Sequence, residues 1–142
     1  MKNNIIDYKN IHLLGIGGAS MYAIAAQLHH DGKHITGSDM QESNNTNYLK
    51  SLGIDITIGH NLNLLNNVDL VIYSSAIAND DPELSFAREH NIECVERAVF
   101  LGEYTKDYDN LICISGTHGK STTTSMIASV FLEANFNPTI QI

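Results

Sequence analysis

The sequence predicts an α/β fold in which a parallel sheet is covered by helices on both faces. Three observations lead to this prediction. Short apolar runs alternate with amphipathic stretches along most of the chain, the segments between them are short, and a glycine-rich turn follows the first apolar run. This alternation is typical of strand–helix–strand units, whose strands pair in parallel and are buried on both sides.

Each expected strand is a short apolar or β-branched run. The expected strands cover residues 11–16, 34–39, 55–59, 68–76 and 92–95. Helices are expected over 19–32, 42–52, 82–90 and 96–105. Gly32 and Gly53 end the first two helices. Asp81 is the expected N-cap of the third helix, with Pro82 at its first position.

The polar stretch 104–110 predicts a domain boundary, which gives a first domain over 1–105 and a second segment over 106–142. In the second segment we expect a strand at 111–115, a helix at 121–134 and the start of a strand at 138–142. These few elements cannot bury a core of their own.

Composition and charge exclude several classes of protein. The chain has 142 residues, 43% hydrophobic and 17% charged, as expected for an ordinary globular protein. A net charge of −8 disfavours nucleic acid and anionic membranes as partners. No apolar run approaches the roughly 20 residues of a membrane span. The polar start resembles no signal peptide, so we expect a cytoplasmic protein.

The cysteines and the clustered histidines predict no metal site. Cys94 and Cys113 both lie in apolar surroundings and are expected to be buried small hydrophobes. His29, His30 and His34 are close in sequence, but Gly32 interrupts the helix that would align them. We interpret them as exposed residues at a helix end.

The first glycine loop, "GIGGAS", matches G-x-G-x-x-G except that Ser20 stands at the third glycine. Gly15 permits a tight turn, Gly17 lets the backbone approach a pyrophosphate, and Gly18 adds freedom. The N–H groups at the start of the next helix attract the anion. The loop therefore predicts a Rossmann-like nucleotide diphosphate site, although such turns also serve only to pack a helix on a strand.

Asp39, at the end of the second expected strand, lies about 20 residues beyond this loop. In dinucleotide-binding folds an acid at this distance accepts hydrogen bonds from a ribose. An aspartate in a turn or at a helix N-cap has the same local sequence, and both interpretations stay open.

The second glycine loop, "GTHGKST", predicts an ATP phosphate site between a strand and a helix. Lys120 would reach the β- and γ-phosphates, and the hydroxyl of Ser121 would ligate Mg²⁺. Ile114 stands where the common pattern has its first glycine. His118 faces the ligand or is simply a loop residue. The predicted phosphate-binding set is Gly116, Thr117, His118, Gly119, Lys120, Ser121 and Thr122.

The motifs taken together resemble the Mur ligase family. The matching stretches, in chain order, are "GIGGASMYAIA", "GSD", "IGH", "YSSAI", "DDPEL", "RA" and "GTHGKSTTTSMIA". They extend over nearly the whole chain, and "GTHGKST" is the wording that marks the family. Ser20, where many members have glycine, is a small departure.

The resemblance implies a first domain over 1–105 that holds UDP-N-acetylmuramate, followed over 106–142 by the truncated start of a central ATP-binding domain. The implied UDP-sugar-binding residues are Gly15, Gly17, Gly18, Ala19, Ser20, Met21, Asp39, His60, Ser74 and Ser75. The implied reaction is ATP-dependent joining of L-alanine to this sugar in peptidoglycan precursor synthesis, through an acyl phosphate. Its cofactors are ATP and Mg²⁺, and Lys120 is the implied catalytic residue.

Family members are roughly three times as long, as expected for three domains. We therefore expect this chain to be the N-terminal part of such a ligase, which binds the UDP-sugar without turnover. The alternatives are a murein-tripeptide ligase of the same family, an NAD-dependent oxidoreductase domain, a stand-alone nucleotide-binding module and a small P-loop NTPase. The oxidoreductase leaves the second loop unexplained, and the NTPase lacks room for a second metal-binding acid.

Overall fold

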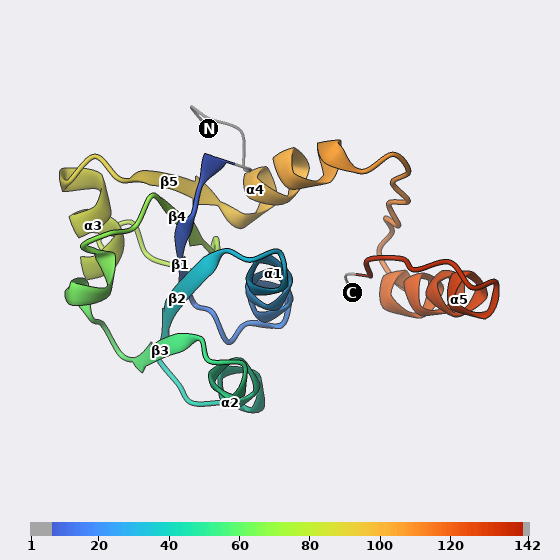
Figure 1. The fold of residues 1–142 in the computed structure, drawn as a ribbon, viewed down its shortest axis with the longest axis horizontal. Coiled ribbons are helices and arrows are strands. Elements are labelled where there is room, and N and C mark those ends of the chain that lie inside the picture. Colours follow the sequence, from blue (N-terminus) through green and yellow to red (C-terminus); the bar gives the residue numbers. More distant parts are fainter. Residues whose placement is uncertain (1–6, 141–142) are drawn as a thin grey trace. The chain divides into compact units, whose positions relative to one another are not determined.

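The computed structural model describes residues 7–140, and Figure 1 shows its fold. The chain divides into two compact units between Asp107 and Tyr108. The boundary expected from the polar stretch, between residues 105 and 106, lies two residues before this division. The first unit holds the sheet, and the second holds one long helix.

The first unit contains a five-stranded sheet with the order β3-β2-β1-β4-β5, and every described pair of strands is parallel. The chain passes outward from β1 to β3 and then crosses to β4 and β5, so the two halves of the sheet meet between β1 and β4. Ligands of open α/β sheets bind at such a point, outside the carboxyl ends of the strands. The strands are β1 Asn10–Leu14, β2 His34–Asp39, β3 Asp55–Ile58, β4 Leu70–Tyr73 and β5 Glu93–Glu96.

The connecting helices begin and end at residues with a local reason to do so. In α2, the hydroxyl of Ser43 accepts from the N–H of Thr46, and the Thr46 hydroxyl accepts in return from the N–H of Ser43. Gly32, with φ +81°, follows the end of α1. The helices of this unit are α1 Ala19–His30, α2 Asn44–Ser51, α3 Pro82–Glu89 and α4 Arg97–Tyr104, with short 3₁₀ helices η2 Leu62–Leu65 and η3 Thr105–Asp107.

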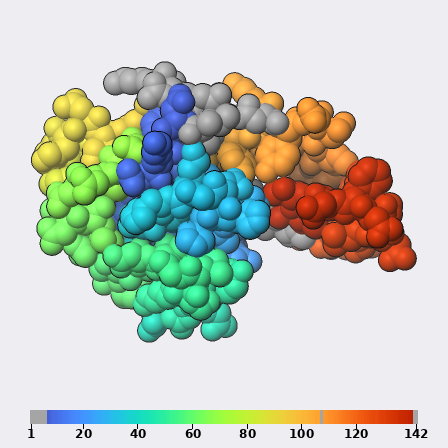
Figure 2. Space-filling view, viewed as in Figure 1, coloured from blue at the N-terminus to red at the C-terminus, as the bar shows by residue number. Residues whose placement is uncertain are grey.

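Two apolar clusters place helices on opposite faces of the sheet. The larger cluster joins Ile11 and Leu13 of β1 to α1, α2 and α4. The smaller cluster joins Leu14 of β1 to η2 and α3. In the space-filling view, the segments from the start and middle of the chain, coloured blue to green, form one packed body (Figure 2). The predicted Rossmann-like parallel sheet with helices on both faces is therefore confirmed.

The alternation of side chains along the strands brings polar groups under the smaller cluster. His12 shares the face of Leu14, and its parallel register pairs it with Thr36 of β2. The side chains on this face include His12, Thr36 and Ser38, all buried in the sheet. Buried polar side chains need hydrogen-bond partners, so this face sets up a polar network beneath the carboxyl edge of the sheet.

The fourth strand is shorter than the expected 68–76, because a turn begins at its carboxyl end. The Ser74 hydroxyl accepts from the N–H of Ala76, and the Ser74 carbonyl accepts from the N–H of Ile77. The 3₁₀ helix η2 was not expected from the sequence. It begins where the side chain of Asn61 accepts from the N–H of Asn63, within an asparagine-rich stretch that has no helical periodicity.

The second unit corrects two expectations. Helix α5, Lys120–Glu133, forms as predicted, but the described residues 111–115 form no strand. A strand is stabilised by pairing with a neighbour, and the described part of this unit offers no second strand. Residues 138–140 form no strand either, and residues 141–142 of the expected final strand lie outside the described residues.

The cysteines also differ from expectation. Cys113 is exposed and Cys94 is half-buried, so Cys113 is not a core residue. Its apolar neighbours predicted burial, but the strand at 111–115 that would pack them into a core does not form. Burial raises the pKa of the Cys94 thiol. Among residues 7–140, no helix is long and apolar enough to span a membrane.

Candidate functional site

The first glycine loop makes the tight turn that its sequence predicts. Gly15 has φ +73°, which favours glycine, and the N–H groups of Gly15 and Ile16 both donate to the carbonyl of Ser38. Gly18 is the N-cap of α1, and no side chain in the described part of the chain caps this helix start. The first N–H groups of α1 therefore point toward the end of the loop, where an anion is stabilised by them and by the helix dipole.

Gly17 is packed against the start of α2. A Cβ at this position would lie 2.8 Å from Cγ2 of Thr46 and 3.0 Å from Oδ2 of Asp39. The side-chain amide of Asn45 also donates to the carbonyl of Gly17 at 2.8 Å. These contacts leave no room for a side chain at position 17. They explain the glycine by packing within the protein, separately from the expected approach of a pyrophosphate.

Asp39 holds this loop in place. Its Oδ2 accepts from the N–H of Gly17 at 2.9 Å, and its Oδ1 accepts from the N–H of Gln41 at 3.1 Å. The sequence left two interpretations of Asp39 open, a ribose acceptor and a turn residue. The hydrogen bonds in the structure are those of a turn residue. The structure thus brings together two predicted site residues, Gly17 and Asp39, through a direct hydrogen bond.

Arg97 adds a cation beside the loop, and sequence reasoning did not single it out as a site residue. It is the first residue of α4, directly after β5, and its Nη1 donates to the hydroxyl of Ser20 at 3.1 Å. Ser20 is in the first turn of α1. A signal was present in the sequence, because an arginine directly after a strand of a parallel sheet lies at the carboxyl edge.

The turn after β4 lies beside the same loop. A Cβ on Gly15 would lie 3.6 Å from Cδ1 of Ile77, which closes the turn that begins at Ser74. Ser75, the other predicted serine, is exposed in this turn. The glycine loop, the Ser74–Ser75 turn and Arg97 follow strands of one parallel sheet, and Asp39 is the last residue of β2. All of them therefore lie at the carboxyl edge of the sheet.

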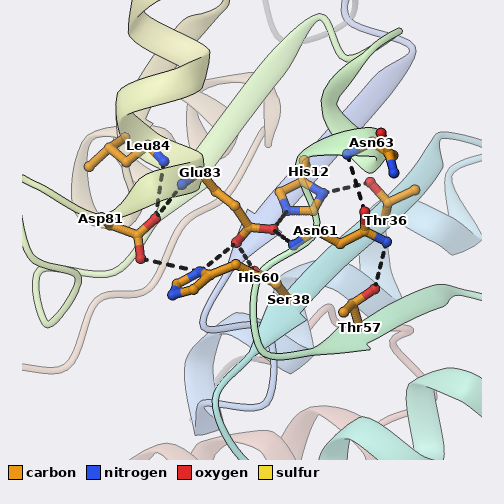
Figure 3. Close-up of polar contacts among 10 residues, drawn as sticks. All are labelled: His12, Thr36, Ser38, Thr57, His60, Asn61, Asn63, Asp81, Glu83 and Leu84. Atoms are coloured by element: carbon orange, nitrogen blue, oxygen red, sulfur yellow. Dashed lines mark hydrogen bonds and ion pairs between the residues drawn. The ribbon is translucent and has the colours of Figure 1, made fainter.

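A buried polar network lies beneath this edge, centred on Glu83 of α3 (Figure 3). Glu83 is only 1% exposed. The hydroxyl of Ser38 donates to its Oε2 at 2.5 Å, and the N–H of Asn61 donates to its Oε1 at 2.9 Å. The carboxylate thus connects β2, the segment after β3 and the start of α3.

His12 lies at the buried end of the network. Its Nδ1 is 2.8 Å from the Thr36 hydroxyl, and its Nε2 is 3.8 Å from Oε1 of Glu83 without a hydrogen bond among the described residues. Burial lowers the pKa of His12 from 6.5 to about 4, although the charges of Glu83 and Asp81 act in the opposite direction. The ring is therefore neutral at pH 7.

His60, a predicted site residue, lies at the solvent end of the network. It follows β3 through Gly59, whose N–H donates to the carbonyl of Asp39. Its Nδ1 is 3.5 Å from Oε2 of Glu83 and 3.8 Å from Oδ2 of Asp81, and its side chain is 36% exposed. His60, Asp81 and Glu83 each place one possible ligand atom within 4.8 Å of the others. Both oxygens of Glu83 already accept hydrogen bonds, which favours a proton network over a metal ion.

Sequence reasoning found His60 but missed His12 and Glu83. The available signal was the presence of polar residues at alternate positions of otherwise apolar strands, "IHLL" and "ITGS". Such residues are buried on one face and must find a partner. Glu83 lies in the first turn of α3, where an acidic residue is favoured by the helix dipole alone, so its local sequence does not mark it as part of a site.

The second glycine loop, in the other unit, leads into a helix through a glycine with positive φ. Gly119 has φ +76° and leads into α5, and Lys120 Nζ donates to the carbonyl of Gly116 at 2.7 Å. The Thr124 hydroxyl donates to the carbonyl of Lys120 within the helix. The residues of the predicted phosphate-binding set, Gly116, Thr117, His118, Gly119, Lys120, Ser121 and Thr122, are all exposed.

A family profile described as "Mur ligase family, catalytic domain" matches residues 10–109, which include every described strand. The chain belongs to the Mur ligase family. The resemblance read from the motifs is therefore confirmed. The matched Mur ligase region ends before the loop at 116–121.

Curated relatives and solved structures agree with this assignment. The chain is 48% identical to the UDP-N-acetylmuramate–L-alanine ligase of Clostridium novyi over 94% of its own length, and 50% identical to that of Caldicellulosiruptor bescii over 91%. The crystal structure of the Thermotoga maritima UDP-N-acetylmuramate–alanine ligase MurC superposes on 89% of the chain with a TM-score of 0.84 and 34% identity. A murein peptide ligase from Psychrobacter arcticus superposes on 89% with a TM-score of 0.82 and 29% identity.

The chain spans less than a third of these Mur ligases. It covers 29% and 28% of the two curated relatives, and 30% and 27% of the two solved chains. The similarity therefore concerns one part of these longer ligases, and it includes the described sheet.

Proposed function

We propose that this chain binds UDP-N-acetylmuramate and belongs to the L-alanine-adding branch of the Mur ligases. The observation that supports this most is the glycine turn at Gly15, which opens α1 at the point where the two halves of the parallel sheet meet. The substrate is inferred from the names of the curated relatives, which are UDP-N-acetylmuramate–L-alanine ligases. Among the solved structures, the L-alanine ligase is 34% identical and the murein peptide ligase 29%, which favours L-alanine as the incoming group.

In the proposed site, the diphosphate lies at the start of α1. The backbone N–H groups of Ala19, Ser20 and Met21 begin this helix, and anions bind well at such positions. Arg97, which already contacts Ser20, would add a charge-assisted hydrogen bond. Because the chain has a net charge of −8, a local cation matters for holding a dianion.

The uridine and sugar would lie along the remaining carboxyl edge of the sheet. Asp39, His60, Ser74 and Ser75 are the residues proposed to contact them. Asp39 has one hydrogen bond to each oxygen in the structure, and a carboxylate can accept about four, so it keeps the capacity to accept from a hydroxyl.

We propose the family's ligase chemistry for the whole protein of which this region is a part. The muramyl carboxylate attacks the γ-phosphorus of ATP, ADP leaves, and an acyl phosphate forms. The amine of L-alanine then attacks the acyl carbon, and phosphate leaves as the amide forms. Charge stabilisation and alignment are the enzyme's main contributions to such a reaction.

The loop at 116–122 is the proposed ATP phosphate site. Lys120 has a flexible ammonium that already lies over the loop, and Ser121 supplies a hydroxyl that would hold Mg²⁺. Bound Mg²⁺ supplies charge neutralisation of the phosphates. The residue types fit this role, while the surrounding unit has no sheet among its described residues. We therefore expect this chain alone to bind the UDP-sugar without ligase turnover.

Calorimetric titration of the chain with UDP-N-acetylmuramate tests the proposal, with NAD as the comparison ligand. We expect saturable binding of the UDP-sugar and none of NAD. Arg97→Gln should weaken binding by about 10- to 100-fold, the usual loss for a hydrogen bond to a charged group. Arg88→Gln, at an exposed position of α3, is the matched control and should bind as the original chain does.

The opposite preference, NAD over the UDP-sugar, would contradict the proposal and favour the oxidoreductase alternative. Release of ADP that depends on UDP-N-acetylmuramate and L-alanine would contradict the expected lack of turnover. Equal binding by the two arginine variants would remove Arg97 from the proposed site.

A further inference from the structure

The two carboxylates beside His60 are both fixed in position. Asp81 Oδ1 accepts from the N–H groups of Glu83 and Leu84 at the start of α3, which directs Oδ2 toward His60. Glu83 is held by the Ser38 hydroxyl and by the N–H of Asn61. Neither acid can turn away from the imidazole without losing these hydrogen bonds.

One ring nitrogen of His60 faces both fixed carboxylates. Nδ1 lies 3.5 Å from Oε2 of Glu83 and 3.8 Å from Oδ2 of Asp81. An unprotonated Nδ1 would direct its lone pair at two oxygen atoms that also act as acceptors, which is unfavourable. A protonated Nδ1 donates toward them, and in a neutral imidazole the other nitrogen is then an acceptor.

The second ring nitrogen of His60 points away from both carboxylates (Figure 3). The side chain is 36% exposed, so a ligand at the carboxyl edge can reach it. In its neutral form the ring therefore presents a lone pair outward, not an N–H group.

We infer that Glu83 is a positioning residue that keeps the proton of His60 on Nδ1, so that Nε2 accepts a hydrogen bond from an N–H or O–H group of the ligand. The inference rests on the proposed function, because a UDP-sugar carries such donors in its base N–H and its sugar hydroxyls. In this arrangement His60 accepts from the base or the sugar. The phosphates, which are acceptors, bind the N–H groups at the start of α1 and Arg97.

His12 completes the network from the buried side. The Thr36 hydroxyl can donate to Nδ1 of His12, which leaves the N–H of Nε2 facing Oε1 of Glu83 at 3.8 Å. All groups around Glu83 are then donors: Ser38 and Asn61 donate hydrogen bonds to the carboxylate, and the N–H groups of both imidazoles face it at 3.5 and 3.8 Å. This arrangement explains why a fully buried histidine lies directly behind a glutamate at the edge of a candidate binding site.

Nitrogen-15 NMR of the histidine rings in the full chain tests the inference without any ligand. Protonated and unprotonated ring nitrogens have well-separated shifts, so the tautomer is read directly once His60 is assigned from a His60→Gln spectrum. We expect Nδ1–H for His60 in the original chain. In Glu83→Gln the side-chain amide can donate to Nδ1, and we expect the ring proton to move toward Nε2.

Binding of UDP-N-acetylmuramate to the same variants supplies the second readout. Glu83→Gln should lose about tenfold in affinity, because Nε2–H no longer accepts from the ligand. Glu89→Gln, an exposed position at the end of the same helix, should change neither the His60 shifts nor the affinity. Circular dichroism checks that each variant folds.

Asp81→Asn covers the case in which Glu83→Gln does not fold, because asparagine also caps a helix. With Glu83 intact, His60 should keep its Nδ1–H tautomer. A reversed tautomer in Asp81→Asn would assign the positioning to Asp81 and overturn the inference.

Three further results would overturn it. They are a proton on Nε2 of His60 in the original chain, unchanged His60 shifts and affinity in Glu83→Gln, and a shift of the His60 signals by stoichiometric Zn²⁺, which would make Nδ1 a metal ligand. If the original chain bound no UDP-sugar, the proposed function would fail, while the tautomer measurement would still decide whether Glu83 positions His60.

Discussion

At the scale of single residues, the buried imidazole of His12 makes stability depend on pH. Its pKa is lowered by burial from 6.5 to about 4, with Glu83 and Asp81 opposing the shift. Between these values the unfolded chain binds a proton that the folded chain does not. The free energy of unfolding therefore falls as the pH falls from 6.5 to 4, by about 3 kcal/mol from this group.

Urea unfolding at a series of pH values measures this loss. The variant His12→Gln keeps a donor and an acceptor but cannot titrate, so its stability should fall less over the same pH range. His30→Gln, at an exposed histidine, should retain the full pH dependence. Equal slopes for His12→Gln and the original chain would show that His12 is not the responsible group.

Gly37 of β2 is a second residue whose environment permits a definite prediction. A Cβ there would lie 2.5 Å from Cδ1 of Ile16 and 2.8 Å from the carbonyl oxygen of Leu13. We expect Gly37→Ala to destabilise the protein by about 1–3 kcal/mol, the usual cost of overpacking a core. Gly102→Ala in α4 meets nothing within 4 Å and should stabilise by about 0.5–1 kcal/mol. Thermal unfolding compares the two, and a stable Gly37→Ala would contradict the prediction.

Sequence reasoning identified those candidate site residues that belong to a recognisable local motif. Gly15, Gly17, Asp39 and His60 were named from motifs, and the structure brings Gly17 and Asp39 into direct contact. His12 and Glu83 could not be paired from the sequence, because their contact depends on the register of β1 and on how α3 packs over it. Arg97 likewise needed the sheet order before it could be placed beside Ser20.

At the scale of elements, α3 depends on one side chain for its start. Asp81 Oδ1 accepts from the N–H groups of Glu83 and Leu84 at 2.9 and 3.1 Å. Asp81→Ala should therefore destabilise the protein by about 1 kcal/mol, the typical loss for an N-cap, whereas Asp81→Asn should cost less. Equilibrium unfolding in urea distinguishes the two variants. Equal losses would show that the charge near His60, and not the cap, determines the cost.

Helix α5 is expected to be the least protected helix in hydrogen exchange. None of its fourteen described residues is buried, and a helix of this length is marginal in water without tertiary packing. We expect its amides to exchange orders of magnitude faster than those of β1 and β4, whose residues lie in the core. Mass spectrometry of peptides from the two units measures this, and equal protection would contradict it.

The elements that were predicted well have strong local signals. Strand β2 matches its expected range, 34–39, and α3 begins at Pro82 after its predicted cap. The prediction of a strand at 111–115 was wrong, because an apolar run forms a strand only beside a partner with which it can pair. The helix η2 was missed because three to four residues contain too little periodicity.

At the scale of the whole molecule, the first unit should be independent of the second. All described strands and both apolar clusters lie before residue 108. We expect a chain of residues 1–107 to unfold at the same temperature as the full chain and to bind UDP-N-acetylmuramate equally well. Calorimetry on both chains tests this. A lower unfolding temperature for the shorter chain would show that residues 108–142 stabilise the sheet.

The network around Glu83 also bears on how such a sequence can change over time. It joins positions 12, 36, 38, 60, 61 and 83, which come from four separate segments but are connected, directly or through His12, to one carboxylate. Loss of one partner leaves another buried polar group unsatisfied, so replacing two partners together should cost less than the sum of the two single replacements. These positions should therefore vary as a group, and a viable homologue that lacks the acid is expected to have replaced the buried histidine as well.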